Sequence, residues 1–180
     1  GCDAIKVRLL LEDQIRDLID RRGALDAVRA AFVALDGGLA IMPPPMELDV
    51  PARHGEVHVK GAYLAGNAFF AFKVATGFYD NAKLGLPIAG GLFIAFDATN
   101  GLLAGLLFDN GWLTEVRTGA AGALAADLLA VQHPQQVGIV GTGGQARYQL
   151  EALVEVRQPK RIVAYGRTRD RAEEFVRDMK

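Results

Sequence analysis

The sequence has little cysteine, little histidine and almost no net charge. Its one cysteine, Cys2, excludes an internal disulfide framework and is typical of a reducing cytoplasm. Because Cys2 lies so close to the terminus, we expect no catalytic role for it. The histidines, His54, His58 and His133, show no spacing with cysteine or acidic residues that would predict a metal site. We expect His54 and His58 to lie along an exposed strand.

The charge balance and the apolar runs bear on the class of protein. A net charge of −1 gives no electrostatic reason to bind nucleic acid or a membrane surface. The longest apolar runs are far shorter than a membrane span, and no signal peptide is recognisable. Hydrophobic residues make up 51% of the 180 residues and charged residues 23%, as in ordinary globular proteins. We therefore expect a cytoplasmic α/β protein of one large or two small domains.

A glycine-rich turn at residues 141–146 is the central feature of the sequence. Residues 137–140 read as a buried strand and run straight into Gly-Thr-Gly-Gly-Gln-Ala, the pattern G-x-G-x-x-A. A helical pattern follows, and residues 161–165 read as a second strand. This order of elements is that of a dinucleotide-binding βαβ unit. The alternative is a βαβ turn with a purely structural role.

Each small residue of this turn has a mechanical role in a dinucleotide site. Gly141 permits the tight turn out of the strand, and Gly143 lets the backbone approach a pyrophosphate. The N–H groups at the start of the helix, at Gly144 and Gln145, would then face the phosphates with the positive end of the helix dipole behind them. We predict that these four residues bind the cofactor.

The end of the second strand indicates which dinucleotide binds. NAD sites usually place an acidic residue there, where it accepts a hydrogen bond from the ribose 2′-hydroxyl. Here Gly166 holds that place, and Arg167 and Thr168 follow it. An arginine supplies charge-assisted donors and a threonine supplies a hydroxyl, which suits a 2′-phosphate. The sequence predicts NADP(H) as the preferred cofactor, with NAD(H) also able to bind; a solvated helix start is the alternative.

The residues before this motif predict a different kind of structure. A strand at residues 4–10 and a helix at residues 24–35 come first. From residue 47 to residue 108 the apolar pattern is that of strands, and Asn100-Gly101 between two apolar runs predicts a hairpin. We expect an antiparallel or mixed sheet here. A long, alanine-rich helix at residues 112–131 then leads to the glycine-rich turn.

Two cations stand out in this first part of the chain. Lys73 lies in the middle of an apolar strand, where a charge is costly unless it is paired. It can hold a carboxylate in a cleft, or extend its ammonium into water from a half-exposed sheet. Arg117 precedes Thr118 and a run of small residues that lets a backbone or a ligand approach. It is suited to binding a carboxylate or phosphate, or it is an exposed helix arginine.

Several segments share their order and spacing with one known family. They are Gly61-Ala-Tyr-Leu, the Lys73 strand, Gly77-Phe-Tyr-Asp-Asn-Ala-Lys-Leu-Gly-Leu-Pro, Leu107-Phe-Asp-Asn-Gly-Trp-Leu-Thr-Glu-Val-Arg-Thr, Arg117-Thr-Gly-Ala-Ala, Gly138-Ile-Val-Gly-Thr-Gly-Gly-Gln-Ala-Arg-Tyr-Gln and Tyr165-Gly-Arg-Thr. Through them nearly the whole chain resembles the ornithine cyclodeaminase/mu-crystallin family. Two of the segments are especially similar to its ectoine-utilisation branch.

The resemblance implies a homodimer that acts on a small amino or imino acid. Residues 1–115 would form an α/β domain for substrate binding and dimerisation, and residues 116–180 the first half of a Rossmann domain. Lys73 and Arg117 match the family's catalytic cations, which bind the substrate carboxylate. We expect Thr118 to bind the cofactor. Arg167 and Thr168 match the pair that contacts the 2′-phosphate in NADP-using members.

Three departures from the family pattern concern the substrate. Pro45 stands where the family often has a further substrate-binding arginine, and Ile88 stands where a serine or threonine often follows Gly-Leu-Pro. Lys60, where many members have an apolar residue, is a candidate replacement cation. The family's catalytic aspartate falls beyond Lys180, so we expect the chain to be part of a longer protein and by itself to lack turnover.

The reaction implied is hydride transfer at the carbon–nitrogen bond next to a carboxylate. In a cyclodeaminase the hydride is returned to the product and ammonia leaves, whereas a ketimine reductase consumes NADPH. A third alternative is a crystallin-type protein that binds NADPH and a small ligand without turnover.

Overall fold

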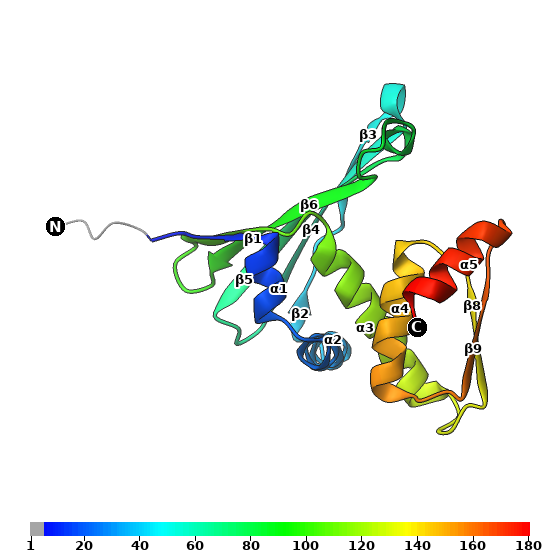
Figure 1. Ribbon diagram of the computed structural model, residues 1–180. Helices are drawn as coiled ribbons and strands as arrows, with labels where there is room; N and C mark the ends of the chain where they lie inside the picture. Colours follow the sequence, from blue (N-terminus) through cyan, green and yellow to red (C-terminus); the bar gives the residue numbers. More distant parts are fainter. Residues whose placement is uncertain (1–5) are drawn as a thin grey trace. The chain divides into compact units, whose positions relative to one another are not determined.

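The computed structural model describes residues 6–180 (Figure 1). Cys2 and the first two residues of the predicted N-terminal strand lie outside the described residues. The chain packs as two compact units. The first contains the residues up to Leu18 together with Ala31–Trp112, and the second contains Ile19–Ala30 and Leu113–Lys180. Helix α2 (Arg21–Asp36) therefore contributes residues to both units.

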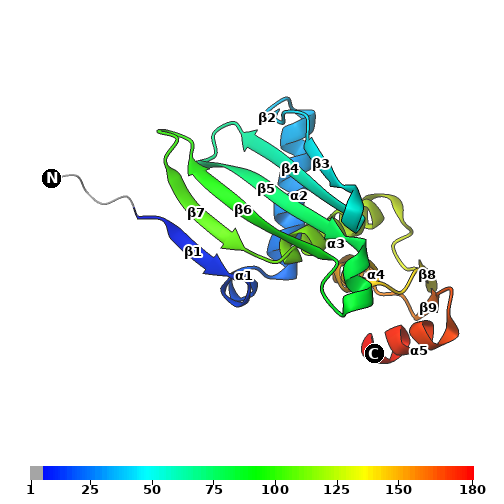
Figure 2. The same cartoon turned by 90° about the horizontal axis from the view of Figure 1, so that it is seen from above.

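A seven-stranded sheet forms the body of the first unit (Figure 2). Its strands follow the order β1-β7-β6-β5-β4-β2, and β3 also pairs with β4. They are β1 (Arg8–Leu11), β2 (Ala40–Ile41), β3 (Met46–Val50), β4 (Gly55–Leu64), β5 (Phe69–Phe78), β6 (Ala89–Asp97) and β7 (Leu103–Phe108). The pairings among these strands are antiparallel except that of β1 with β7, which is parallel. The sheet is therefore mixed, one of the two predicted forms.

The hairpin predicted at Asn100-Gly101 joins β6 to β7. The Asp97 N–H donates to the Leu102 carbonyl at 2.9 Å, and the Asp97 carboxylate accepts from the Thr99 N–H at 2.7 Å. Gly101 has a φ of 73°, in the left-handed region that glycine adopts without strain. The carboxylate and the glycine together close the turn, which confirms the prediction.

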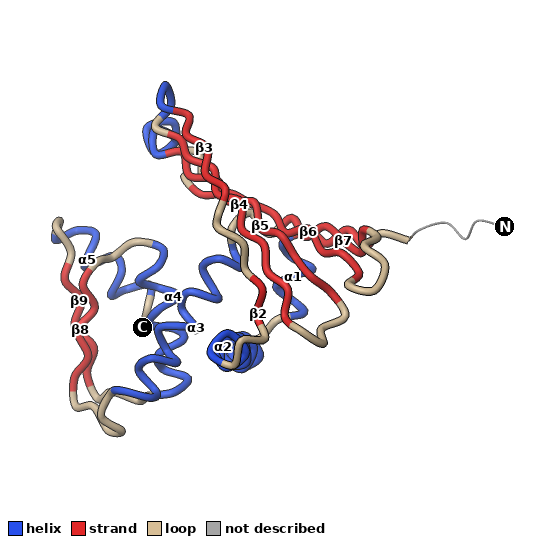
Figure 3. Tube along the Cα trace, turned by 180° about the vertical axis from the view of Figure 1, so that it is seen from behind, coloured by secondary structure: helices blue, strands red, loops and turns tan. Residues whose placement is uncertain are grey.

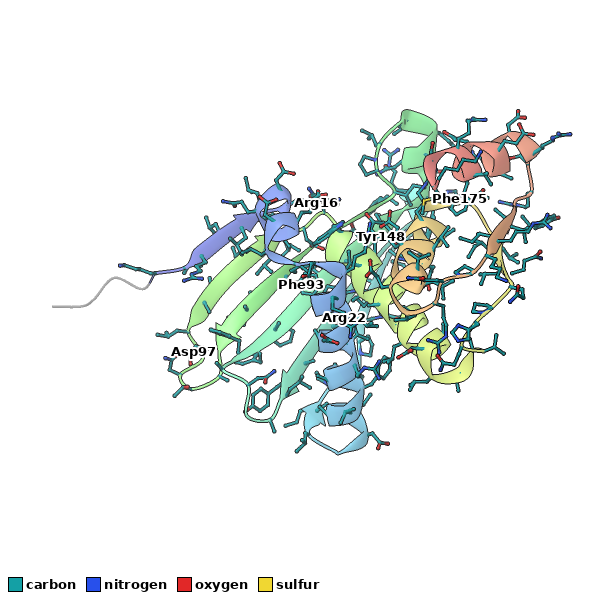
Figure 4. The ribbon with its side chains drawn as sticks, turned by 60° about the horizontal axis from the view of Figure 1, so that its bottom comes forward. Arg16, Arg22, Phe93, Asp97, Tyr148 and Phe175 are labelled. Carbon is teal, nitrogen blue, oxygen red and sulfur yellow. The ribbon has the colours of Figure 1, made fainter. Side chains whose placement is uncertain are left out.

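Helix α1 (Glu12–Leu18) is anchored to the first unit by one apolar and one basic side chain. Ile15 is 1% exposed and is the helix's buried residue. Arg16, labelled in Figure 4, pairs with Glu12 at 2.6 Å. Its guanidinium lies over the Trp112 ring, 4.7 Å from the centroid. Glu12 also accepts from the Asn110 side chain at 3.0 Å. These contacts tie α1 to the end of β7.

Helix α3, a βαβ unit and a further helix make up the C-terminal part of the second unit. The elements are α3 (Trp112–Leu129), β8 (Gln136–Val140), α4 (Gly144–Val156), β9 (Arg161–Tyr165) and α5 (Arg169–Asp178). Strands β8 and β9 lie side by side and parallel, with α4 as their connection (Figure 3). This is the first part of a Rossmann fold, as the sequence predicted. The short, parallel strands match the predicted ranges closely.

Helices α3 and α4 approach closely because glycines face the contact. A Cβ on Gly119 would lie 2.6 Å from the Tyr148 carbonyl oxygen, and one on Gly122 would collide with the Gln149 side chain. The Gln149 amide donates to the Thr118 carbonyl at 3.0 Å. The small-residue run after Arg117 thus accommodates another backbone, that of α4. This is one of the two explanations that the sequence left open.

A shared carboxylate, that of Asp127, connects three helices in the second unit. Arg157, the C-cap of α4, has a side chain that is 3% exposed and pairs with Asp127 at 2.7 Å. Arg29, near the middle of α2, pairs with the same carboxylate at 2.9 Å. Leu25 packs there against Ala123 and Leu124 of α3. The ion pairs therefore close one end of this unit's small apolar core.

The apolar faces predicted for the long helices are only partly buried. Leu25 and Leu124 are buried, whereas Phe32 of α2 is 53% exposed and Leu128 of α3 is 66% exposed. Among residues 6–180 no helix is long and apolar enough to cross a bilayer. The same residues contain no group of three or more His, Cys, Asp or Glu side chains placed to hold a metal ion.

Candidate functional site

The turn after β8 has the geometry that the glycine pattern predicted. Gly141 has a φ of 108°, and its N–H donates to the Tyr165 carbonyl at 2.8 Å, which links the ends of the two parallel strands. A Cβ on Gly141, Gly143 or Gly144 would meet no heavy atom within 4 Å among the described residues. The three glycines therefore face open space, and a ligand can approach their backbone.

Helix α4 begins at this turn without a side-chain cap. Its N-cap, Gly143, has extended backbone and no side chain to accept from the first N–H groups. An uncapped helix start leaves those donors for an anion, and the helix dipole favours negative charge there. The fit to a pyrophosphate thus rests on backbone geometry, as in other dinucleotide sites.

A pocket of about 730 Å³ opens at the carboxyl ends of β8 and β9. It is lined by residues of three segments: Val140, Gly141, Thr142 and Gly143 after β8, Tyr165, Gly166, Arg167 and Thr168 after β9, and Arg171 in α5. No carboxylate is among these lining residues, and two arginines are. The pocket is therefore suited to an anionic ligand, and it brings together Gly141, Gly143, Arg167 and Thr168 as predicted.

An acid at Gly166, where NAD sites usually have one, would crowd the turn after β8. A Cβ there would lie 3.1 Å from both the Cγ2 and the Oγ1 of Thr142. The Thr142 side chain would therefore have to give way by a few tenths of an ångström. The glycine at this position fits the close approach of Thr142.

Sequence reasoning missed Arg171 as a residue of this pocket. It lies in the first turn of α5, which begins at Arg169. The available signal was the arginine-rich run Arg167-Thr-Arg-Asp-Arg directly after Gly166. Arg169, in the same run, instead pairs with Glu173 at 2.7 Å and lines a separate hollow with Ala164 and Val176.

Two of the predicted cofactor residues use their side chains within the second unit. The Gln145 amide donates to the Glu115 carboxylate and to the Glu115 carbonyl. The Thr118 hydroxyl donates to the Thr114 carbonyl at 2.7 Å, one turn back in α3. The Gln145 bonds fix the start of α4 against α3, whereas the Thr118 bond lies within α3. Gln145 thereby positions the glycine-rich turn, and its role as a cofactor ligand stays a prediction.

The two lysines of the predicted substrate site are neighbours in the sheet. Lys60 of β4 lies directly opposite Lys73 of β5, and Lys73 lies opposite Phe93 of β6 on its other side. Lys60 is exposed and Lys73 is half-buried. Both belong to the first unit, whereas Arg117, an exposed residue of α3, belongs to the second. That Lys73 and Arg117 meet one substrate therefore stays a prediction.

His54 is not on a strand, contrary to expectation. It follows a short 3₁₀ segment, Pro51–Arg53, in a left-handed conformation with a φ of 44°, and β4 begins at the next residue. His58 does lie on β4. The Asp80 carboxylate accepts from Lys83 at 2.6 Å and contacts the His54 ring at 2.8 Å. Lys83 first and His54 second lower the pKa of Asp80, which makes it a poor proton donor.

Comparison with known proteins adds to this geometry. The model of the ornithine cyclodeaminase/mu-crystallin family matches residues 6–180. A protein of Sinorhizobium fredii named as an uncharacterized cyclodeaminase is 43% identical over 178 residues, which cover 97% of this chain and 53% of the relative. The alanine dehydrogenase of Archaeoglobus fulgidus is 33% identical over 168 residues, covering 93% and 51%.

The solved structures extend the likeness to three dimensions. The Δ¹-pyrroline-2-carboxylate reductase of Thermococcus litoralis, in complex with NADH and L-proline, superposes with a TM-score of 0.90 at 30% identity. The match covers 96% of this chain and 53% of that one. The chain thus spans about half the length of the relatives it matches. With its glycine-rich turn, its pocket and a family match over all the described residues, the chain belongs to the ornithine cyclodeaminase/mu-crystallin family.

Proposed function

We propose that the protein is an NAD(P)-dependent enzyme acting by hydride transfer at the carbon–nitrogen bond next to the carboxylate of an amino or imino acid. Alanine, proline and pyrroline-2-carboxylate, the compounds in the names of two relatives and one complex, all carry nitrogen on the carbon next to a carboxylate. The first unit would bind the substrate and form a homodimer, and the second would be the first half of the Rossmann domain, with the boundary near residue 115.

The pocket beyond β8 and β9 is the observation that carries this proposal. It combines a turn open to a pyrophosphate at Gly141 and Gly143 with cationic donors at Arg167 and Arg171. When bound there, a nicotinamide dinucleotide would supply the hydride acceptor or donor. The residues that line this pocket would hold the cofactor's phosphates. The nicotinamide would then be free to react with the substrate.

The preferred cofactor, we propose, is NADP(H). The support is Gly166, whose Cβ position is closed by Thr142, followed by the Arg167 guanidinium and the Thr168 hydroxyl at the pocket wall. An anionic 2′-phosphate pairs with such donors, whereas a 2′-hydroxyl gains little from them. The archaeal reductase was solved with NADH, so dinucleotide choice need not be shared across the family.

Lys73 and Arg117 would each bind the substrate carboxylate, as the family resemblance implies, with Lys60 as an additional cation. Lys60 and Lys73 stand on one face of the sheet because residues directly opposite in an antiparallel pair point the same way. An anion beside them is attracted by two ammonium groups. Pro45 and Ile88 stand where the family often has an arginine and a serine or threonine, so ornithine itself is not supported as the substrate. Membership of the ectoine-utilisation branch remains a prediction from the sequence.

Three reactions fit this site, and one assay separates them. The full-length protein is incubated with NADPH or NADP⁺ and a panel of α-amino acids and cyclic imino acids. Ammonia release without net change in NADPH absorbance indicates cyclodeamination, our first choice because a relative at 43% identity is named as an uncharacterized cyclodeaminase. Net loss of NADPH indicates an imine or ketimine reductase. Binding of NADPH with neither change indicates a crystallin-type binding protein, and failure to bind either NADPH or NADH contradicts the proposal.

A further inference from the structure

Arg171 holds an unusual place in the second unit. It lies in the first turn of α5, three residues after the N-cap Thr168. A cation there faces the positive end of the helix dipole, which disfavours it. Local rules of this kind are most often broken at functional sites. The side chain is exposed and lines the pocket beyond β8 and β9.

Arg169, in the same turn, offers a direct comparison. Its guanidinium pairs with Glu173 one turn further along α5, so its charge is balanced within the helix. It lines a different hollow. In the described part of the chain Arg171 has no such ion pair, and its pocket holds no carboxylate. Of two arginines in one helical turn, only Arg171 has its charge directed at the pocket.

Thr168 contributes a second donor beside Arg171. As the N-cap of α5, a threonine would ordinarily accept from an N–H of the first turn. The structure has no such side-chain bond, so the hydroxyl remains for another partner. Arg167 lines the same wall immediately before it. Two arginines and a threonine thus line the same pocket.

We propose that Arg171 is a specificity-determining residue that binds the 2′-phosphate of NADP(H) together with Arg167 and Thr168. This inference rests on the proposed function, because it assigns a ligand group within the same pocket. A 2′-phosphate carries between one and two negative charges near neutral pH, which one guanidinium alone does not balance. Two arginines four residues apart can bind it from two sides.

The test compares Arg171→Ala with Arg169→Ala as a matched control. Each variant removes one exposed arginine from the same turn, and only the first removes it from the pocket. Dissociation constants for NADPH and for NADH are measured by fluorescence titration, with circular dichroism to check folding. We expect Arg171→Ala to reduce the NADPH-to-NADH affinity ratio at least about tenfold, the effect of losing a charge-assisted bond. Arg169→Ala should leave the ratio unchanged.

The outcomes are distinct. An unchanged ratio in Arg171→Ala overturns the inference while leaving the proposed function standing. Equal reductions in both variants overturn it too, since they indicate a general effect of positive charge. If the unmutated protein binds neither NADPH nor NADH, the proposed function itself fails and the inference fails with it.

Discussion

Lys60 on β4 stands directly opposite Lys73 on β5, within the antiparallel register that runs from Gly55 opposite Phe78 to Ala62 opposite Ala71. Side chains in such a pair share one face of the sheet, with Cβ atoms about 4.5–5.5 Å apart. Like charges in this position destabilise a sheet. We predict that an anionic group of the substrate binds on this face of the sheet, beside the two lysines.

Replacing Lys73 should separate substrate binding from cofactor binding. In Lys73→Met of the full-length protein the long side chain remains and the charge is lost, so we expect the substrate KM to rise at least about tenfold, as for loss of one charge-assisted hydrogen bond. The dissociation constant of NADPH should barely change. Lys83→Met, which removes a lysine already paired with Asp80, is the control and should behave like the unmutated protein. Equal weakening of substrate and NADPH in Lys73→Met would contradict the assignment.

Replacing Arg167 should remove most of the preference for NADPH. Losing one charge-assisted pair with the 2′-phosphate costs about 1.5–3 kcal/mol of NADPH binding and leaves NADH binding nearly as it was. Isothermal titration with both cofactors measures the difference. Arg161→Ala is a matched control, because Arg161 begins β9 and Arg167 follows the strand's other end. The prediction is wrong if the unmutated protein binds the two cofactors equally well.

The second unit was predictable from sequence because its signals are local. A strand of small and branched residues, a glycine turn and a helix occur within residues 136–156, and Gly141 has the positive φ that its turn requires. The hairpin at Asn100-Gly101 was predictable because its signal is local too. The hydrogen bonds that close the hairpin turn join residues that are close in the chain.

The remaining features depend on contacts between residues far apart in the sequence. The parallel pairing of β1 with β7 joins Arg8 to Gly105, and no short pattern specifies it. The burial of Leu25 but not Phe32 on α2 depends on which helices pack there. Gln145 reads as a cofactor residue from its motif, yet its amide is used by Glu115 of another helix. Sequence spacing cannot show such competition for a side chain.

The pairing of Asp127 should make stability depend on pH in the acidic range. Arg157 first and Arg29 second lower the pKa of Asp127 in the folded chain. A lowered folded-state pKa means that this stabilisation is complete above the unfolded value of about 3.9 and is lost as pH falls through the folded value. We expect Asp127→Asn to be less stable than the unmutated chain at neutral pH, and this difference to shrink on acidification.

Urea unfolding from about pH 7 down to about pH 3 measures this difference. Asp26→Asn is the control, since the Asp26 carboxylate is 64% exposed and lies 3.9 Å from Arg22. Such a surface pair contributes little. If Asp127→Asn keeps the same deficit at every pH, the deficit comes from lost packing and not from the ionised pair.

Converting the cofactor preference should require two changes, because Thr142 closes the space beside Gly166. Gly166→Asp supplies the carboxylate that would accept from a ribose 2′-hydroxyl, but its Cβ would lie 3.1 Å from Thr142 Cγ2 and Oγ1. We expect the single variant to weaken both cofactors, since the Thr142 side chain at the pocket wall must give way. Gly166→Asp with Thr142→Ala removes both blocking atoms and should bind NADH better than NADPH. Thr142→Ala alone, which adds no carboxylate, should keep the original preference.

Titration of all three variants with NADPH and NADH measures their cofactor preference. A single Gly166→Asp variant that already prefers NADH, without loss of affinity, would show that Thr142 does not restrict this position.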